Sequence, residues 1–137
     1  MILLWLDDYR NPFLDVEGKV LYALEYLPCS SIHWVRNYDE FVAWIEKYGL
    51  PASISFDHDL ADEHYTPQEH WYSDEKVREW MEAQEWVEKT GYDCAKYLVE
   101  YCMDNKKILP FYSCHSANPV GKKNILSLLN NYVKHAN

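Results

Sequence analysis

Three short, mostly apolar runs in this chain each end on a group of polar side chains. The runs cover residues 3–6, 54–56 and 111–114, and they lead into Asp7-Asp8, Asp57-His58-Asp59 and His115-Ser116. A short apolar run closed by polar residues is typical of a buried strand in a parallel sheet. The carboxyl ends of parallel strands meet at one edge, where open α/β sheets bind ligands. The pattern therefore predicts one site built from three distant segments.

The remaining periodicities predict an alternation of strands and helices. Strands are expected at residues 2–7, 31–35, 52–56 and after Pro110, and helices at 14–27, from Asn37, from Asp93 and from Asn118-Pro119. Asn37 and Glu40 form a capping box, and Asn118 is a helix cap followed by proline at the first helical position. The spacing in 14–27 is interrupted by Gly18. Short connections predict right-handed crossovers and a doubly wound, mainly parallel four-stranded α/β sheet in the order 2-1-3-4, in a single domain of residues 1–137.

Residues 61–90 interrupt this alternation as an insertion after the third strand. They contain nine acidic and three basic residues, so they carry −6 of the net charge of −9. Helical periodicity over 74–88 predicts an amphipathic helix within the insertion. Because it follows Asp57-His58-Asp59 directly, the insertion is predicted to act as a lid with an aromatic residue that stacks on a base. The alternative is that its aromatic residues only pack it onto the domain; they are Tyr65, Trp71, Tyr72, Trp80 and Trp86.

The net charge and the cysteine content limit which binding partners and which cellular compartment are expected. A net charge of −9 argues against tight binding to duplex DNA, which depends on Lys and Arg displacing counterions. No apolar stretch approaches the roughly 20 residues of a membrane span, so neither a membrane anchor nor a signal peptide is expected. The four cysteines, at positions 29, 94, 102 and 114, have no metal-binding or disulfide spacing. We therefore expect a cytoplasmic protein, whose oligomeric state the sequence leaves open.

The carboxylates at the strand ends suit a divalent cation. Asp7 and Asp8 follow the first strand and Asp57 follows its neighbour in the expected sheet. Three carboxylates at that range repel one another unless a cation or a proton intervenes. Hard oxygen ligands favour Mg²⁺ or Mn²⁺, which keep water ligands and bridge to a phosphate. The alternative is that these aspartates only cap turns and helices.

The side chains beside the carboxylates suit phosphate chemistry. His115 and His58 can exchange a proton near neutral pH, although a lone histidine at a strand end is more often a structural hydrogen-bonding group. Arg10 either clamps a phosphate or pairs with Asp8.

The start of the last helix resembles an anion cradle. Ser116, Asn118 and the backbone N–H groups of the first turn can contact phosphate oxygens, and Lys122 adds positive charge one turn further on. Ser116 could also be a nucleophile, but the chain has no triad spacing to support that role.

Four motifs occur in a characteristic order along the chain. They are Leu4-Trp5-Leu6-Asp7-Asp8 with Arg10 and Pro12, Ser55-Phe56-Asp57-His58-Asp59-Leu60, Gly91-Tyr92-Asp93, and His115-Ser116-Ala117-Asn118-Pro119-Val120-Gly121. Together they resemble the cyclic-phosphate processing receiver domain. The resemblance implies a fold similar to response-regulator receivers, strand-end acids that bind a divalent ion, and processing of a cyclic nucleotide or of a 2′,3′-cyclic phosphate at an RNA end. By motif position it assigns the site to Asp7, Asp8, Asp57, Asp59, His115, Ser116 and Asn118, with Arg10 and His58 beside them.

Two departures from related patterns bear on function. The chain has no evident fifth strand to deliver the lysine of a phospho-receiver, which argues against aspartyl-phosphate signalling. It also carries the acidic insertion, which could restrict the site to small nucleotides.

The leading interpretation is a metal-dependent phosphoesterase. Its expected parts are metal ligands Asp7, Asp8 and Asp57, catalytic residues His115, His58, Ser116 and Asp59, and phosphate-binding residues Arg10, Ser116, Asn118 and Lys122. One alternative is a protein that binds a cyclic nucleotide without cleaving it, and another is a degenerate receiver that regulates through partners.

Overall fold

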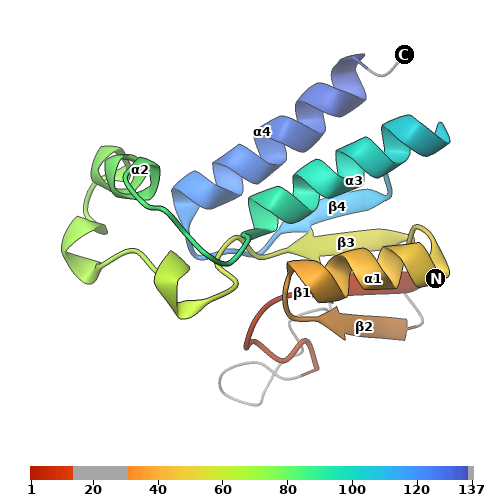
Figure 1. The fold of residues 1–137 in the computed structure, drawn as a ribbon, viewed down its shortest axis with the longest axis horizontal. Helices are drawn as coiled ribbons and strands as arrows, with labels where there is room; N and C mark the ends of the chain where they lie inside the picture. The colour runs from red at the N-terminus through yellow and green to blue at the C-terminus, as the bar shows by residue number, and fades with distance from the viewer. Residues whose placement is uncertain (14–30, 136–137) are drawn as a thin grey trace.

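A computed structural model describes residues 1–13 and 31–135 of the chain (Figure 1). Its strands are β1 (Ile2–Leu6), β2 (Ser31–Val35), β3 (Ser53–Phe56) and β4 (Phe111–Cys114). Its helices are α1 (Tyr38–Tyr48), α2 (Asp74–Glu82), α3 (Gly91–Asn105) and α4 (Pro119–His135), with 3₁₀ turns η2 (Asp62–His64) and η3 (Gln68–His70). The expected helix at 14–27 and Cys29 lie outside the described residues. None of the described helices is long and apolar enough to cross a membrane.

The four strands form one parallel sheet in the order β2-β1-β3-β4. This confirms the predicted receiver-like α/β topology. In register, Trp5 of β1 lies between Trp34 of β2 and Ser55 of β3, and Ser55 pairs in turn with Ser113 of β4. The carboxyl ends of β1, β3 and β4 are therefore neighbours, as the interpretation of the three polar clusters requires.

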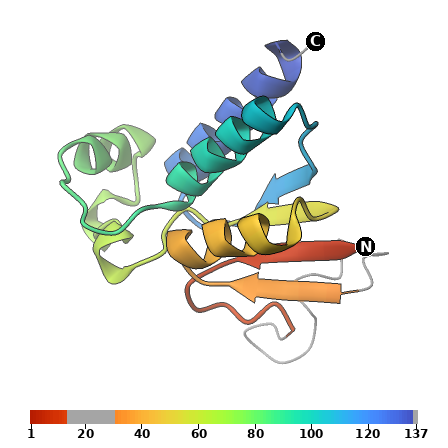
Figure 2. The ribbon, with the colours of Figure 1, turned by 45° about the vertical axis from the view of Figure 1, so that its right-hand side comes forward.

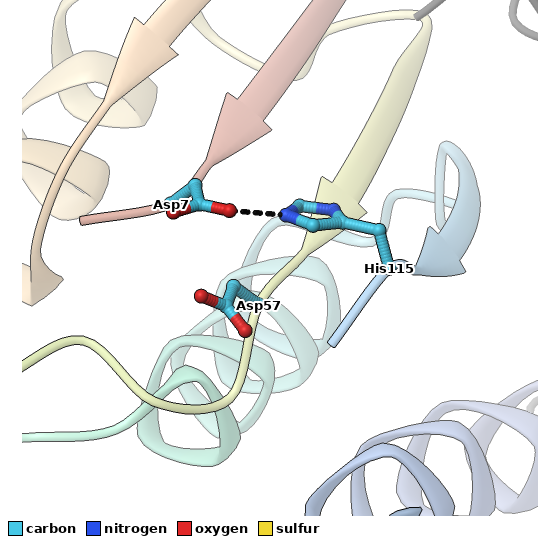
Figure 3. A group of neighbouring side chains, drawn as sticks. All are labelled: Asp7, Asp57 and His115. Carbon is cyan, nitrogen blue, oxygen red and sulfur yellow. Dashed lines mark hydrogen bonds and ion pairs between the residues drawn. The ribbon is translucent and has the colours of Figure 1, made fainter. Parts of the chain in front are cut away.

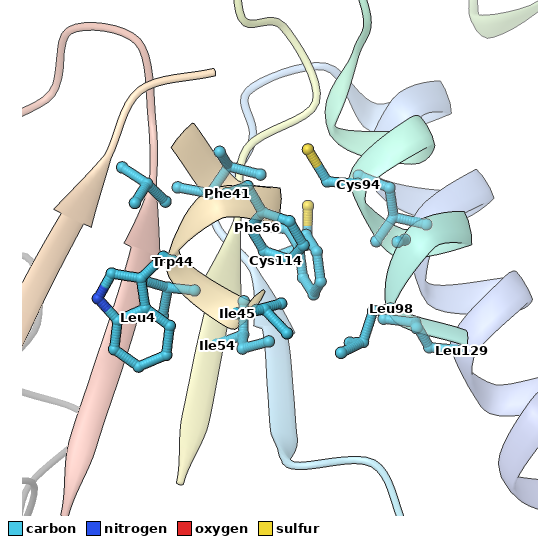
Figure 4. Close-up of a cluster of buried hydrophobic side chains, with 14 of the residues drawn as sticks. Leu4, Phe41, Trp44, Ile45, Ile54, Phe56, Cys94, Leu98, Cys114 and Leu129 are labelled. Atoms are coloured by element: carbon cyan, nitrogen blue, oxygen red, sulfur yellow. The ribbon is translucent and has the colours of Figure 1, made fainter. Parts of the chain in front are cut away.

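The main core lies between one face of the sheet and helices α1, α3 and α4 (Figures 2 and 4). Successive strand residues face opposite sides, so Leu4 and Leu6 enter this core whereas Leu3 and Trp5 form a second cluster on the other face. Buried members of the main core include Phe41, Trp44, Ile45, Ile54, Phe56, Cys94, Leu98, Ile125 and Leu129. The doubly wound part of the prediction concerns the second face and depends on residues 14–30, which are outside the described ranges.

The helices that flank the sheet begin at identifiable caps. Asn37 Oδ1 accepts the Glu40 N–H at 2.9 Å, and Asn118 Oδ1 accepts the Gly121 N–H at 2.9 Å, as expected for N-caps. Helix α3 begins earlier than the predicted Asp93. Its cap is Thr90, and the Asp93 carboxylate accepts the Thr90 N–H at 2.9 Å to complete a capping box.

The insertion lies beyond the carboxyl ends of the strands (Figure 1). Its helix α2 ends at Glu82, so the predicted helix over 74–88 is six residues too long. At the end of the helix, the Gln84 side chain donates to the Trp80 carbonyl at 2.8 Å, and the Ala83 N–H donates to the same carbonyl at 3.2 Å. Beyond this point Trp86 turns back against His64 and Trp80, with ring centroids 4.8 and 6.0 Å apart. Tertiary packing of Trp86 therefore overrides the local helical periodicity.

Candidate active site

The hydrogen-bond ladder of the sheet continues into the three residues that form the centre of the site. The Asp57 N–H donates to the Leu6 carbonyl at 3.0 Å, and the His115 N–H donates to the Phe56 carbonyl at 2.9 Å. The Asp7 N–H likewise donates to the Val35 carbonyl at 3.1 Å. These backbone hydrogen bonds therefore fix Asp7, Asp57 and His115 at adjacent strand ends, independently of the contacts of their side chains.

Asp7, Asp57 and His115 bring two carboxylates and an imidazole together (Figure 3). Each offers one ligand atom, and these atoms all lie within 4.8 Å of one another. Asp7 is fully buried and Asp57 is 4% exposed. Two ligands of one ion at about 2.1 Å can be no more than about 4.2 Å apart, so a small inward movement would complete the geometry for Mg²⁺ or Mn²⁺. Two carboxylates and an imidazole form a donor set that fits a divalent cation.

Asp7 is held as an ionised carboxylate by a ring of donors. Its Oδ1 accepts the backbone N–H groups of Tyr9 at 2.9 Å and Arg10 at 2.8 Å, and its Oδ2 lies 2.8 Å from Nε2 of His115. Burial raises the pKa of Asp7, but the hydrogen bonds from His115 and the two backbone groups outweigh it and hold the pKa below its usual value. Asp7 is thus a fixed negative charge at the bottom of the site.

The His115 ring is held rigidly on both sides. It stacks on the Trp5 indole at a centroid distance of 3.8 Å and an interplanar angle of 6°. Its Nδ1 lies 2.7 Å from Ser55 Oγ while Nε2 contacts Asp7. A metal-bound histidine commonly donates its other ring N–H to a neighbouring acceptor, and Ser55 is placed for that role. This arrangement suits a metal ligand, and the proton transfer expected of His115 from the sequence stays a prediction.

The ionised form of Asp57 is disfavoured, because this carboxylate is buried close to other carboxylates. Burial, together with the nearby charges of Asp7 and Asp59, raises the pKa of Asp57 to about 8, although Arg10 and a hydrogen bond from Ser116 oppose the change. A cation bound between Asp7 and Asp57 would relieve this repulsion and release the Asp57 proton.

The structure places Asp8 outside this group. Both of its carboxylate oxygens accept the Tyr65 hydroxyl, at 3.0 and 3.1 Å. Asp8 therefore holds the insertion to the end of β1, and His115 stands where the sequence led us to expect a third aspartate.

A cleft of about 360 Å³ opens beside the three-residue group. It is lined by Arg10, Asp57, Asp59, Tyr65, Thr66, Trp71, Val77, Ala117, Asn118 and Pro119. The Arg10 side chain donates through Nη1 to the His115 carbonyl at 3.2 Å, and the same atom lies 3.9 Å from Asp7 Oδ2. Arg10 thus contacts Asp7 and His115 rather than Asp8, and its guanidinium lies at the wall of the cleft.

The expected anion cradle is only partly available to a ligand. Asn118 lines the cleft, but its Nδ2 donates to Asp59 Oδ1 at 3.3 Å and its Oδ1 caps α4. Ser116 Oγ accepts the Asn118 N–H at 3.1 Å and also hydrogen-bonds Asp57. Lys122 is exposed and lines neither of the two described cavities. Arg10 is therefore better placed to meet a phosphate than Lys122.

His58 lies beside a second cavity, also of about 360 Å³, and does not line the first. The ring is 2% exposed, and its Nδ1 lies 2.7 Å from Asp59 Oδ1. It packs so closely on α4 that a Cβ added to Gly121 would lie 2.4 Å from His58 Cγ. His58 therefore supports Asp59, which lines the cleft, and is not itself placed to meet a ligand there.

The Gly91-Tyr92-Asp93 motif has a structural explanation. A Cβ at Gly91 would lie 1.8 Å from the Asp57 carbonyl oxygen, and the Gly91 N–H donates to the His58 carbonyl at 2.8 Å. Only glycine allows α3 to begin this close to the backbone that positions Asp57.

Sequence reasoning missed the role of Ser55 in the site and the contact of Tyr65 with Asp8. Ser55 is a fully buried hydroxyl inside a four-residue buried strand, and a polar residue at such a position requires a partner. The sequence therefore contained a signal for Ser55, namely a polar residue inside a strand predicted to be buried. The Tyr65 contact with Asp8 spans 57 positions, and no local pattern indicates it.

The family model for the cyclic-phosphate processing receiver domain matches residues 2–131. Within the described residues, the match includes all four strands and all four α-helices, apart from the last turn of α4. No curated protein and no solved structure is similar enough to the chain to give a match. The ordered motifs, the parallel sheet and this near-complete match agree, and the chain belongs to the family of cyclic-phosphate processing receiver domains.

Proposed function

We propose that this domain is a metal-dependent phosphoesterase that opens a cyclic phosphate by adding water. The observation that carries the proposal is the meeting of two buried carboxylates and a fixed imidazole, with ligand atoms within 4.8 Å, beside a cleft that Arg10 lines. Membership of a cyclic-phosphate processing family supports the substrate class. Asp7, Asp57 and His115 would hold Mn²⁺ or Mg²⁺, and the ion when bound would polarise the phosphate.

The chain's own residues bind and orient the phosphate. A guanidinium has five N–H donors, so Arg10 can keep its bond to the His115 carbonyl and still donate to a phosphate oxygen. With the ion bound, Ser55 would accept the Nδ1 proton of His115 at the 2.7 Å contact, and Nε2 would then offer its lone pair to the ion instead of a hydrogen bond to Asp7. The insertion, residues 61–90, is the lid over this cleft, closed by the Tyr65 contact with Asp8.

Asp59 is the residue we assign to take a proton from the attacking water. It is the cleft carboxylate that lies outside the three-residue group, and His58 Nδ1 lies 2.7 Å from its Oδ1 and helps to hold it in place. In the reaction, the water oxygen bonds to phosphorus and gives up a proton to Asp59, the bond to one ribose oxygen breaks, and that oxygen takes up the proton that the water released. The product is a phosphate monoester.

A second candidate is a protein that binds a cyclic nucleotide and releases it unchanged. Both ring nitrogens of His115 are engaged, by Asp7 and Ser55, and His58 lines the other cavity. Neither histidine is therefore placed as a mobile acid for the leaving oxygen, which favours binding without cleavage.

The two candidates are separated by incubating the protein and Mn²⁺ with 2′,3′-cyclic, 3′,5′-cyclic and cyclic oligonucleotide phosphates. Mass-resolved chromatography follows the gain of one water. The phosphoesterase proposal predicts hydrolysis that Asp57→Asn abolishes and that Asp62→Asn, a change at an exposed carboxylate of the insertion, preserves. Recovery of bound, unchanged ligand from the wild type would favour the second candidate, and hydrolysis by a folded Asp57→Asn variant would refute the proposed site.

A further inference from the structure

The insertion contributes aromatic side chains to the same cleft that holds the carboxylates. Tyr65, Thr66 and Trp71 all line the cleft, together with Arg10 and Asp57. A cleft that combines a cation, carboxylates and flat aromatic surface suits a ligand with an anionic part and a planar apolar part. A volume of about 360 Å³ is near the lower end of the range for small-ligand sites, so one small molecule would fill it.

Trp71 is oriented although it contributes little to packing. Its indole N–H donates to the Thr66 carbonyl at 2.9 Å, while the side chain remains 67% exposed. An exposed tryptophan held in one orientation presents a ring face that a planar group can cover.

Residues other than Trp71 pack the insertion. Trp86 packs at a tilt against His64 and Trp80, with ring centroids 4.8 and 6.0 Å apart. His64 is fully buried, and it accepts the Leu60 N–H at 2.9 Å and contacts the Glu88 carbonyl at 2.8 Å. The structural need for aromatic residues in this segment is therefore met without Trp71.

Thr66 adds a polar group beside the Trp71 ring. Its Oγ1 is buried and has no hydrogen-bond partner among the described residues. A buried hydroxyl without a partner is costly, and a small rotation of this lining residue would let it donate to a ligand.

We propose that the cleft binds a nucleotide, with its base stacked on Trp71 and its cyclic phosphate at Arg10 and the Asp7–Asp57–His115 group. This inference rests on the proposed function, because it assumes the phosphate at that group. It goes further by assigning the base to Trp71 of the insertion, and it therefore predicts tighter binding of a cyclic phosphate that carries a nucleobase than of one that lacks a base. Tyr65, 40% exposed and fixed to Asp8 through its hydroxyl, forms a second wall next to the base.

The test measures equilibrium binding, in Mn²⁺, of two ligands that differ in the base. One is a nucleoside cyclic phosphorothioate and the other is glycerol cyclic phosphorothioate, which has no base; the sulfur makes both resist cleavage. Trp71→Ala is expected to weaken nucleotide binding roughly 5- to 150-fold, the range for losing one base–aromatic stack, and to leave binding of the glycerol ligand unchanged. Trp71→Phe should retain part of the affinity. Tyr72→Ala is the matched control, since Tyr72 is 77% exposed and lines neither described cavity.

Unchanged nucleotide affinity in Trp71→Ala, or an equal loss for both ligands, would overturn the inference. Equal affinity of the wild type for the two ligands would do the same while leaving the phosphoesterase proposal intact. Conversely, a selective loss of nucleotide binding in a protein that hydrolyses nothing would support the inference and refute the phosphoesterase. A short RNA with a terminal 2′,3′-cyclic phosphate shares the base and phosphate, so Trp71→Ala should weaken it too. Comparing the affinity for this RNA with the affinity for the free nucleotide shows whether the cleft prefers an RNA end or a free nucleotide.

Discussion

Replacing Asp57 with asparagine is expected to stabilise the metal-free protein at neutral pH. Burial and the charges of Asp7 and Asp59 raise the pKa of Asp57 from its ordinary value of 3.8 to about 8. A carboxylate whose folded-state pKa is raised stabilises the fold fully below its unfolded pKa, and this stability is lost as the pH rises through the folded pKa. The loss therefore falls between pH 3.8 and about 8. Asparagine is similar in shape and has no proton to lose.

The magnitude follows from the linkage relation. Each pH unit inside this window costs the wild type up to about 1.4 kcal/mol of unfolding free energy, and the slope flattens near pH 8. Between pH 6 and pH 8 the wild type should lose about 2 kcal/mol relative to Asp57→Asn. With a urea m-value of about 2 kcal/mol/M, the difference between the two midpoints should change by about 1 M.

Urea unfolding in EDTA at pH 6, 7 and 8 measures this effect. The comparison of wild type with variant cancels groups that titrate in both proteins. Asp62→Asn, at an exposed carboxylate, should follow the wild type. Mn²⁺ should stabilise the wild type at pH 8 and leave Asp57→Asn unchanged. A wild-type midpoint that does not fall relative to Asp57→Asn between pH 6 and 8 would refute the electrostatic reasoning.

Three further changes probe the supports of the site. Gly91→Ala would place a Cβ 1.8 Å from the Asp57 carbonyl oxygen, so it should cost at least about 1–3 kcal/mol in urea unfolding; an unchanged midpoint would contradict the close approach. Tyr65→Phe removes the hydroxyl that binds both Asp8 oxygens, so a Glu-specific protease should cut the insertion faster, whereas an unchanged rate would show that this contact does not hold the lid. Ser55→Ala removes the hydroxyl 2.7 Å from Nδ1 of the site histidine and should weaken Mn²⁺ binding about 10- to 100-fold; calorimetry showing equal affinity would exclude the supporting role.

Local signals in the sequence were enough to predict the sheet and most helix starts. Apolar runs ended by polar clusters placed β1, β3 and β4, and the asparagine caps placed the starts of α1 and α4. The start of α3 was readable but missed, because Thr90 and Asp93 have capping-box spacing. The end of α2 was not readable, since the packing of Trp86 against His64 decides it.

From the sequence, the location of the candidate site at the strand ends was easier to predict than the contacts of its side chains. Two of the three side chains that meet, Asp7 and Asp57, were expected to do so as ligands. Neighbouring residues at a strand end point in different directions, so Asp7 and Asp8 could not be assumed to face one ion. The direction of Asp8 is set by Tyr65 in the insertion, a long-range contact. His115 was expected to transfer a proton, and its stacking on Trp5 became visible only in the folded chain.

Direct Mn²⁺ binding to four variants tests the central claim, that Asp7, Asp57 and His115 hold a divalent ion. Calorimetry or electron paramagnetic resonance would compare the wild type with Asp7→Asn, Asp57→Asn, His115→Ala and Asp8→Asn, after circular dichroism has shown that each is folded. The geometry predicts that the first three lose the ion and that Asp8→Asn, whose carboxylate contacts Tyr65 instead, keeps it. Loss of Mn²⁺ in Asp8→Asn with retention in His115→Ala would contradict this assignment of the ligands.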